Sequence, residues 1–313
     1  MPDKPCPYHR GLFIVCVLLA CCVFPLVIVG AGVTSKGAGM AFPDWPTSAG
    51  HLVNPPAWWQ QENTRWEHGH RLIGWTVGML AIAATAFAWR RRPTIRWATR
   101  ATLLAIVVQG VLGGLRVTEV STLLAMLHGI WGQVCFTLAC VTALLASRGW
   151  YAMEPAQWVK SGAHSRRLAV WVVLAVFLQL GFGAALRHFK SDVALACHLV
   201  WLVIVCFSVG WLTLWIMGAH AGRRLLVRLT QMLAILLTIQ LILGSLAFLV
   251  TTMPDYWSPM MKWLVPSGHV ALGALILASS AMVAATTMRQ FAPARPPHNR
   301  SKKMTQPNWS QNE

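Results

Sequence analysis

Apolar residues occur along this chain in eight long runs, each separated from the next by a polar or turn-rich segment. The runs cover residues 11–32, 67–89, 99–118, 121–147, 166–187, 191–217, 226–251 and 262–288. Each has the length of about 20 residues that a helix needs to cross the apolar core of a bilayer. The runs are continuous and lack the alternation of apolar and polar residues that is typical of membrane β-strands. The pattern therefore predicts an all-α, polytopic membrane protein with about eight transmembrane helices.

The two halves of this pattern resemble each other. Val-Gln-Gly-Val-Leu-Gly at 108–113 in the third run is similar to Ile-Gln-Leu-Ile-Leu-Gly at 239–244 in the seventh. Internal repeats of this kind are typical of membrane proteins with pseudo-symmetric halves. We therefore expect two pseudo-symmetric four-helix bundles that join near 152–163, with Gln109 and Gln240 forming hydrogen bonds between helices. The expected boundaries are an N-terminal half at 1–150, a C-terminal half at 151–290 and a disordered cytoplasmic tail at 291–313.

The distribution of charge along the chain predicts how the helices are oriented in the membrane. The composition is 56% hydrophobic and 11% charged, and the formal net charge is +17. Of the 26 lysines and arginines, 19 lie in the termini or in the segments after the second, fourth and sixth runs. Such an excess marks the cytoplasmic side of a membrane protein, so we expect both termini in the cytoplasm and a multi-pass location in the inner cell membrane. The basic charge is explained by topology, and we expect no nucleic-acid partner.

Four histidines lie inside otherwise apolar runs, each near the end of its run that faces outward. They occupy the second and fourth runs of each half, and they are His70, His128, His198 and His269. Polar groups at membrane depth are costly and usually functional, and neutral imidazole is a common axial ligand of haem iron. The four histidines therefore predict two bis-histidine haem sites towards the outer face. The alternatives are histidines that only form hydrogen bonds between helices, or a metal cluster, for which no matching set of Asp, Glu or Cys is evident.

Other polar residues near the outer ends of the runs are candidates for chemistry. Glu67 and His70 are three residues apart and share a helix face, so a carboxylate beside a haem could stabilise positive charge or move protons. The alternative for Glu67 is a helix-start residue that interacts with the helix dipole. Arg116 and Arg187 could bind haem propionates or extend to the membrane interface. The remaining histidines are expected to be solvated: His9, His51, His68, His164, His188, His220 and His298.

The first outward loop, 33–66, is long and rich in Trp and Pro. Tryptophan at this level usually marks the membrane interface, but a loop of this length can also cover a site as a lid.

With these residues assembled, the chain resembles the haem A synthase family, which are membrane enzymes that convert haem O to haem A for cytochrome oxidase. The resemblance extends from the first run to the last. The segments that carry it are Val33-Thr34-Ser35-Lys36-Gly37-Ala38-Gly39-Met40, Pro43-Asp44-Trp45-Pro46, Glu67-His68-Gly69-His70-Arg71, Gln109 with Gly113-Gly114 and Arg116, Leu127-His128-Gly129, His198, and Gly268-His269.

The resemblance implies a role for each matching position. His198 and His269 would be the axial ligands of a tightly held haem B, and His70 and His128 would bracket the substrate haem O. Glu67 matches the catalytic carboxylate of the family. The implied reaction oxidises one porphyrin methyl group to a formyl group through hydroxylated intermediates. Haem O synthase is the implied upstream partner, membrane lipid surrounds the protein, and the resemblance leaves the electron acceptor and the oligomeric state open.

The chain departs from the family pattern in its first loop. Phe42 and Ser48 stand where many bacterial members have a pair of cysteines, so thiol chemistry in this loop is not expected here. A competing hypothesis is a non-enzymatic di-haem cytochrome b that passes electrons from quinol, which would need the same histidines. A transporter with structural histidines is a third possibility and predicts no haem.

Overall fold

The computed structural model describes residues 8–293, and eight of its helices are long and apolar enough to cross a membrane. The all-α prediction is therefore confirmed. The eight helices are α1 (Arg10–Ser35), α2 (Glu62–Ala88), α3 (Pro93–Thr118), α4 (Thr122–Ala146), α6 (Gly162–Phe189), α7 (Asp192–Ala219), α8 (Arg224–Thr252) and α9 (Pro259–Gln290), with a short α5 (Arg148–Tyr151) and a single 3₁₀ turn at Pro254–Tyr256.

Several helices begin earlier than the apolar runs predict. Helix α2 starts at Glu62 and α3 starts at Pro93, which occupies the first turn of its helix. Proline is favoured at that position because its missing N–H has no partner in a first turn. Hydrophobicity marks only the part of a helix that lies in the bilayer, so it misses polar turns that extend beyond the apolar core. At the other end of the chain, Phe291 is fully buried and its neighbour Ala292 donates a backbone hydrogen bond to Gln157, so ordered structure continues past position 290.

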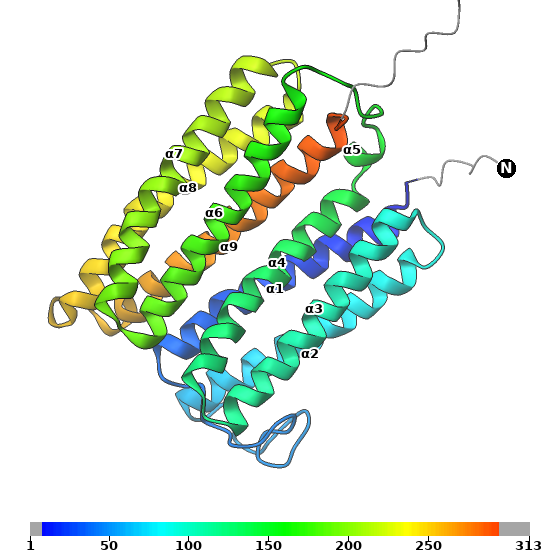
Figure 1. Cartoon of the computed structure of the whole chain (residues 1–313). Coiled ribbons are helices and arrows are strands. Elements are labelled where there is room, and N and C mark those ends of the chain that lie inside the picture. Colours follow the sequence, from blue (N-terminus) through cyan, green and yellow to red (C-terminus); the bar gives the residue numbers. More distant parts are fainter. Residues whose placement is uncertain (1–7, 294–313) are drawn as a thin grey trace, which may run out of the picture.

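The eight helices are arranged in two groups that follow their order in the chain (Figure 1). Within the first group α1 contacts α2, α2 contacts α3, α3 contacts α4, and α4 contacts α1. Helices α6, α7, α8 and α9 repeat the same closed sequence of contacts. Between the groups, α1 contacts α9, α4 contacts α6, and α4 contacts α9, which is the set that a two-fold axis between equivalent halves would produce. The pseudo-symmetry of the two bundles itself stays a prediction.

Helix α9 occupies the centre of the protein. In its most apolar stretch 61% of the residues are buried, against 17–39% for the seven other long helices. Its small residues explain this position, because alanine, serine and glycine let neighbouring helix backbones approach closely inside a membrane. Ala274 and Ala278, for example, belong to a buried cluster with Leu19 of α1 and Phe136 of α4. The core of the second half is formed separately by α6, α7, α8 and α9.

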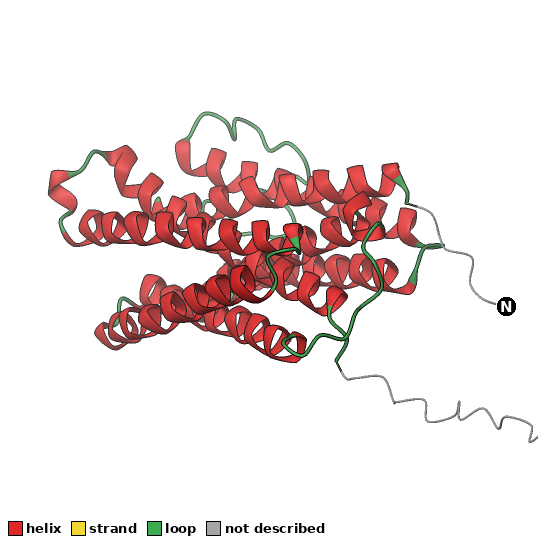
Figure 2. Ribbon diagram, turned by 90° about the horizontal axis from the view of Figure 1, so that it is seen from above, coloured by secondary structure: helices red, strands yellow, loops and turns green. Residues whose placement is uncertain are grey.

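The helices run side by side, and their connections collect at two ends (Figure 2). We call the end that carries the segment 36–61 the loop end. Helices α1, α3, α6 and α8 finish there and α2, α4, α7 and α9 begin there, so both described ends of the chain lie at the opposite end (Figure 1). All four histidines of the apolar runs are within the first three turns of helices that start at the loop end.

Candidate haem-binding site

A single cavity of about 1340 Å³ extends from one half of the protein into the other, and all four histidines line it. Its volume exceeds the range of about 300–1,000 Å³ that is typical of small-molecule sites. Most of its lining is apolar and comes from the two groups of helices. A cavity of this size and composition suits large, flat and mainly apolar ligands.

The structure brings the four histidines together as two pairs. His70 of α2 and His128 of α4 have ring centroids 6.3 Å apart, with an angle of 59° between the rings. His198 of α7 and His269 of α9 have ring centroids 6.4 Å apart, with an angle of 73°. Metal–imidazole bonds of about 2 Å place the centres of two rings on opposite sides of one metal ion about 6 Å apart. Both pairs therefore have the spacing of two axial ligands.

Each histidine packs against a glycine of the preceding helix. A Cβ atom built on Gly30, Gly113, Gly183 or Gly244 would lie 2.8–3.0 Å from the imidazole of His70, His128, His198 or His269, respectively. Real Cβ atoms do not approach ring atoms so closely, because carbon atoms attract each other best at about 3.5–4.0 Å. Glycine at these four positions is therefore what allows the ring to lie close to the neighbouring helix. The repeat of this contact in four helix pairs agrees with the predicted internal duplication.

Three of the four histidines also contact a glutamine located one turn before that glycine. Gln109 and Gln240 form the interhelical hydrogen bonds that the sequence predicts, to His128 and His269. Gln179 forms the same contacts with His198, and the sequence analysis missed it. The signal was present as a repeat of Gln-x-x-x-Gly at 109–113, 179–183 and 240–244.

Glu67 lies at the edge of the cavity beside the first histidine pair, and the residue is 5% exposed. One carboxylate oxygen accepts hydrogen bonds from the backbone N–H groups of Ala41 (2.6 Å) and Phe42 (3.2 Å). The other oxygen forms an ion pair with Arg71. Helix α2 begins five residues earlier, with Glu62 as the acidic residue of its first turn. The alternative that Glu67 serves the positive end of the helix dipole is therefore wrong.

Arg71 and Glu67 also hold the loop between α1 and α2 over the first half of the cavity. The Arg71 guanidinium donates hydrogen bonds to the backbone carbonyls of Asp44 (2.8 Å), Thr47 and Phe42 (3.4 Å). Trp45 of the same loop lines the cavity and packs on Gly114 of α3, where an added Cβ would lie 2.5 Å from the indole. The loop thus covers the site as the lid hypothesis predicts.

Asp44 stabilises the turn that follows it in this loop. Burial disfavours its charged form, but hydrogen bonds from the Thr47 hydroxyl and from the backbone N–H groups of Gly50 and Ala49 outweigh this effect and lower its pKa to about 2. The carboxylate is therefore ionised throughout the physiological range.

The two loop positions where a cysteine pair was considered both contact the same histidine. Ser48 lies 3.0 Å from His68 Nδ1 through its hydroxyl, and the Phe42 ring lies 6.0 Å from the His68 ring. The carbonyl of Val53 is 2.9 Å from His68 Nε2. His68 is 1% exposed, so the prediction that it is solvated is wrong. It is a structural residue that connects α2 to the loop.

Arg116 and Arg187 line the cavity from the loop ends of α3 and α6. Arg116 donates one hydrogen bond to the Gly39 carbonyl (3.0 Å). Arg187 donates to the Ala31 carbonyl and to the Ser35 hydroxyl, both at 2.8 Å. Both guanidinium groups therefore point inward to α1 and its following loop, where their remaining N–H groups are available to an anionic group in the cavity.

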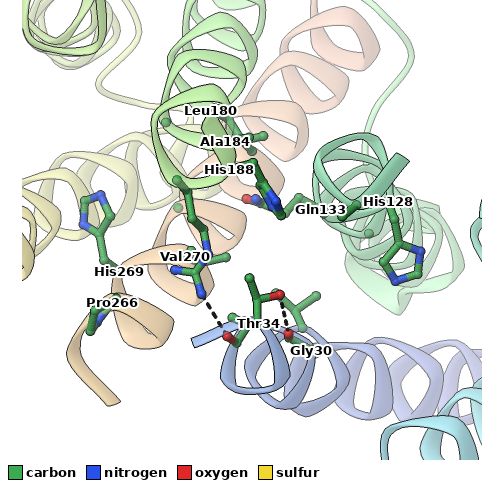
Figure 3. A pocket seen from close by; sticks show the side chains of 18 of the residues that line it. Gly30, Thr34, His128, Gln133, Leu180, Ala184, His188, Pro266, His269 and Val270 are labelled. Atoms are coloured by element: carbon green, nitrogen blue, oxygen red, sulfur yellow. Dashed lines mark hydrogen bonds between the residues drawn. The ribbon is translucent and has the colours of Figure 1, made fainter. Parts of the chain in front are cut away.

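Polar side chains also lie between the two histidine pairs. His188 and Gln133 occupy the middle of the cavity, with His128 on one side of them and His269 on the other (Figure 3). Gln133 is 7% exposed and its side-chain carbonyl has no partner among the described residues. His188 is half-buried. The expectation of a solvated side chain is wrong for His220, which is 6% exposed and lies 2.8 Å from the Ser165 hydroxyl. His298 lies outside the described residues.

The donor set fits haem better than a free metal ion. Among residues 8–293 no group of three or more His, Cys, Asp or Glu side chains is close enough to hold a metal ion. A pair of imidazoles supplies only two ligands, so an octahedral iron would need four further ligands in a plane, which a porphyrin provides. The wide apolar cavity and the two inward-facing arginines suit the ring and the propionates of such a group.

Comparison with known proteins identifies relatives of the chain. The model of the COX15-CtaA family, described as cytochrome oxidase assembly protein, matches residues 13–198. Relatives named heme A synthase are 28% identical in Shouchella clausii, 27% in Bartonella quintana and 31% in Symbiobacterium thermophilum. The alignments cover 60%, 54% and 54% of this chain and 62%, 55% and 56% of the respective relatives. The chain thus spans about three fifths or less of the length of the curated relatives it matches.

The family match includes Glu67, His70, His128 and His198, and it ends before His269. It covers more than half of the chain, including nearly all of the first half of the protein. The chain therefore belongs to the COX15-CtaA family of cytochrome oxidase assembly proteins, the haem A synthase family.

Proposed function

We propose that this protein is a haem A synthase that oxidises a methyl group of haem O to a formyl group through hydroxylated intermediates. One observation carries the proposal: a single cavity contains two imidazole pairs with the spacing of axial ligands, and only one pair has a buried acid beside it. Glu67 is the only buried acidic side chain among the described residues. This asymmetry supports a substrate site in the first half and a resident cofactor in the second.

In the first half, His70 and His128 would bracket the substrate porphyrin, and Glu67 would act at its edge. The carboxylate accepts hydrogen bonds from two backbone N–H groups and pairs with Arg71, and these contacts fix its position at the edge of the cavity. A fixed negative charge stabilises positive charge that develops next to the ring during oxidation. We therefore favour electrostatic stabilisation over proton transfer as the role of Glu67.

In the second half, His198 and His269 would hold haem B, which supplies one-electron transfer when bound. Arg187 would bind a propionate there and Arg116 would do so in the first half, since both line the cavity from the loop end. The excess of basic residues at the opposite end supports a cytoplasmic location for both termini and an outward location for both haem sites. Haem O synthase would supply the substrate.

The direct test is haem extraction and chromatography from cells that express this chain together with a haem O synthase. Haem A, or its hydroxylated precursor, should appear only when this chain is present. Unchanged haem O together with haem B bound to the purified protein would refute the proposal and favour the di-haem electron carrier. The comparisons give no support to that carrier, because the relatives carry the name heme A synthase.

The Glu67→Gln variant tests the role of the carboxylate. Glutamine keeps the size of the side chain and can still accept the backbone hydrogen bonds, but it loses the charge. Haem binding should persist while aldehyde formation stops. Glu119→Gln is the matched control, because Glu119 is exposed at the same end of the protein. A normal yield of haem A from Glu67→Gln would remove this residue from the mechanism.

A further inference from the structure

The three histidine–glutamine contacts form one repeated arrangement, which we call the glutamine bridge. In each, the glutamine side-chain nitrogen donates a hydrogen bond to the backbone carbonyl of the histidine, at 3.1 Å for Gln109, 3.0 Å for Gln179 and 3.1 Å for Gln240. The same nitrogen lies 3.3–3.4 Å from Nε2 of that histidine. One amide group thus contacts both the backbone and the ring, and this restricts rotation of the imidazole.

His70 is the exception. Each glutamine of a bridge precedes the glycine that contacts the histidine by four residues, and the corresponding residue before Gly30 is Leu26. Leu26 and Gly30 both line the cavity, one turn apart on the same face of α1. Leucine has no hydrogen-bonding group, and the His70 side chain forms no hydrogen bond within the part of the chain that the structure describes. His70 is therefore the one member of the two pairs without a glutamine bridge.

The helix surface one turn after His70 also differs from that one turn after His128 and His269. Gly132 and Gly273 follow His128 and His269 by one turn, and Cβ atoms there would lie 3.0 Å from Gln109 Nε2 and 3.5 Å from Gln240 Nε2. The bridging amides thus fill the space above both glycines. Gly74 follows His70 by one turn, and nothing lies within 4 Å of a Cβ built there. The space beside Gly74 is consequently not filled by a bridging amide.

The second pair is held more firmly than the first. Both His198 and His269 have glutamine bridges, and His198 Nδ1 also lies 3.3 Å from the backbone carbonyl of Gln179. A hydrogen bond from the ring nitrogen that does not bind the metal, such as that from His198 Nδ1 to the Gln179 carbonyl, fixes the orientation of a ligating imidazole. In the first pair only His128 has a glutamine bridge. A porphyrin in the first half would therefore have one fixed axial ligand and one that can rotate away.

We propose that His70 is the exchangeable axial ligand of this protein, and that the absence of a glutamine bridge at Leu26 lets the first-half porphyrin be released while the second-half porphyrin is retained. The glutamines act as positioning residues through the histidines that they contact. This inference rests on the proposed function, because it assumes that both pairs hold a porphyrin. It adds that the bond from His70 to the porphyrin metal would open when substrate and product exchange, and that the residue at position 26 controls this opening.

The test uses the full chain in lipid nanodiscs, loaded with haem B and mixed with excess apomyoglobin as a haem acceptor. We expect two phases of haem loss of equal size, a fast phase from the first pair and a slow phase from the second. The His198→Ala variant should keep only the fast phase. Equal rates for both haems in the unmodified protein would overturn the inference and leave the proposed function standing. Failure of the protein to bind haem would overturn both.

Leu26→Gln supplies the missing bridge. It should slow the fast phase by about two- to tenfold, which is the effect expected of one added hydrogen bond, and leave the slow phase unchanged. Leu26→Met is the matched control, because it keeps the apolar volume without an amide and should change neither phase. In the opposite direction, Gln179→Leu should accelerate the slow phase. Identical exchange in Leu26→Gln and Leu26→Met would contradict the inference.

Carbon monoxide gives a second readout that a purely structural role of Leu26 would not move. In the reduced, unmodified protein, CO should bind to the one haem whose histidine can leave the iron, and the other haem should stay unreactive. Leu26→Gln should slow CO binding by the same factor as haem loss. Equal reactivity of both haems towards CO would contradict the assignment of His70 as the exchangeable ligand.

Discussion

Replacing Gly244 by alanine tests whether the close contact between helix and imidazole is required for haem binding. A Cβ at this position would lie 2.8 Å from Cε1 and 3.3 Å from Nδ1 of His269. The ring cannot turn away freely, because Gln240 contacts both its Nε2 (3.4 Å) and the His269 backbone carbonyl (3.1 Å). The substitution therefore has to displace either the imidazole or helix α9.

The size of the effect follows from these distances. An ordinary carbon–carbon contact of about 3.6 Å would require a displacement of about 0.8 Å, which is large compared with the tolerance of a metal–ligand bond. Overpacking of this kind costs about 1–3 kcal/mol, equivalent to roughly five- to 150-fold weaker haem binding. The higher helix propensity of alanine offsets part of this cost in the stability of the fold, by about 0.5–1 kcal/mol, but it does not restore the position of the imidazole.

The assay is the molar ratio of haem to purified protein by the pyridine haemochrome method. For protein loaded with haem B, we expect two haems per unmodified chain and about one for Gly244→Ala. Gly210→Ala in α7 is the matched control: Gly210 is exposed and has nothing within 4 Å of an added Cβ. This control should keep both haems. A wild-type haem ratio and spectrum in Gly244→Ala would refute the argument that His269 needs glycine opposite its ring.

Three further predictions follow from the site. His198→Ala or His269→Ala should each lose one haem by the same assay, and unchanged haem content in both would remove the second-half site. Arg71→Lys should keep the charge next to Glu67 but lose most of the hydrogen bonds to the loop. Cleavage of segment 36–61 in limited proteolysis should therefore accelerate, and an unchanged cleavage rate would contradict this role of Arg71. The pKa of Asp44 is lowered from 3.8 to about 2, so its stabilisation of the loop is complete above about pH 4 and is lost as the pH falls towards 2. The rate of loop proteolysis should therefore be independent of pH between 5 and 8. Asp44→Asn should accelerate proteolysis throughout that range.

Much of the fold is predictable from the sequence because it depends on local requirements. Inside a bilayer each segment must satisfy its own backbone hydrogen bonds, so a continuous apolar run of about 20 residues becomes a helix whatever its neighbours are. The number and order of the long helices follow from this requirement. The predicted positions of the helix ends were less accurate, as for the helices that start at Glu62 and Pro93. Polar turns outside the bilayer are stabilised by capping and packing, which the hydrophobicity of the sequence does not report.

The candidate site was predictable only in part. His70 and His68 are two residues apart, and about 100° of rotation per residue sends their side chains to different sides of α2. One lines the cavity and the other connects to the loop through Ser48 and Val53. Sequence reasoning separated them by apolar context, but it assigned His68 to solvent. The direction of a side chain depends on what the rest of the protein places next to it.

The sequence by itself determined that this is an eight-helix membrane protein with four costly histidines near one end of its helices. The tertiary structure decided which histidines pair, that a glycine lies against each ring, and that glutamines support three rings but not that of His70. The physical reason is the distance in sequence over which each kind of interaction acts. Helix formation depends on residues a few positions apart, whereas the pairing of His198 with His269 depends on how α7 and α9 pack against their neighbours.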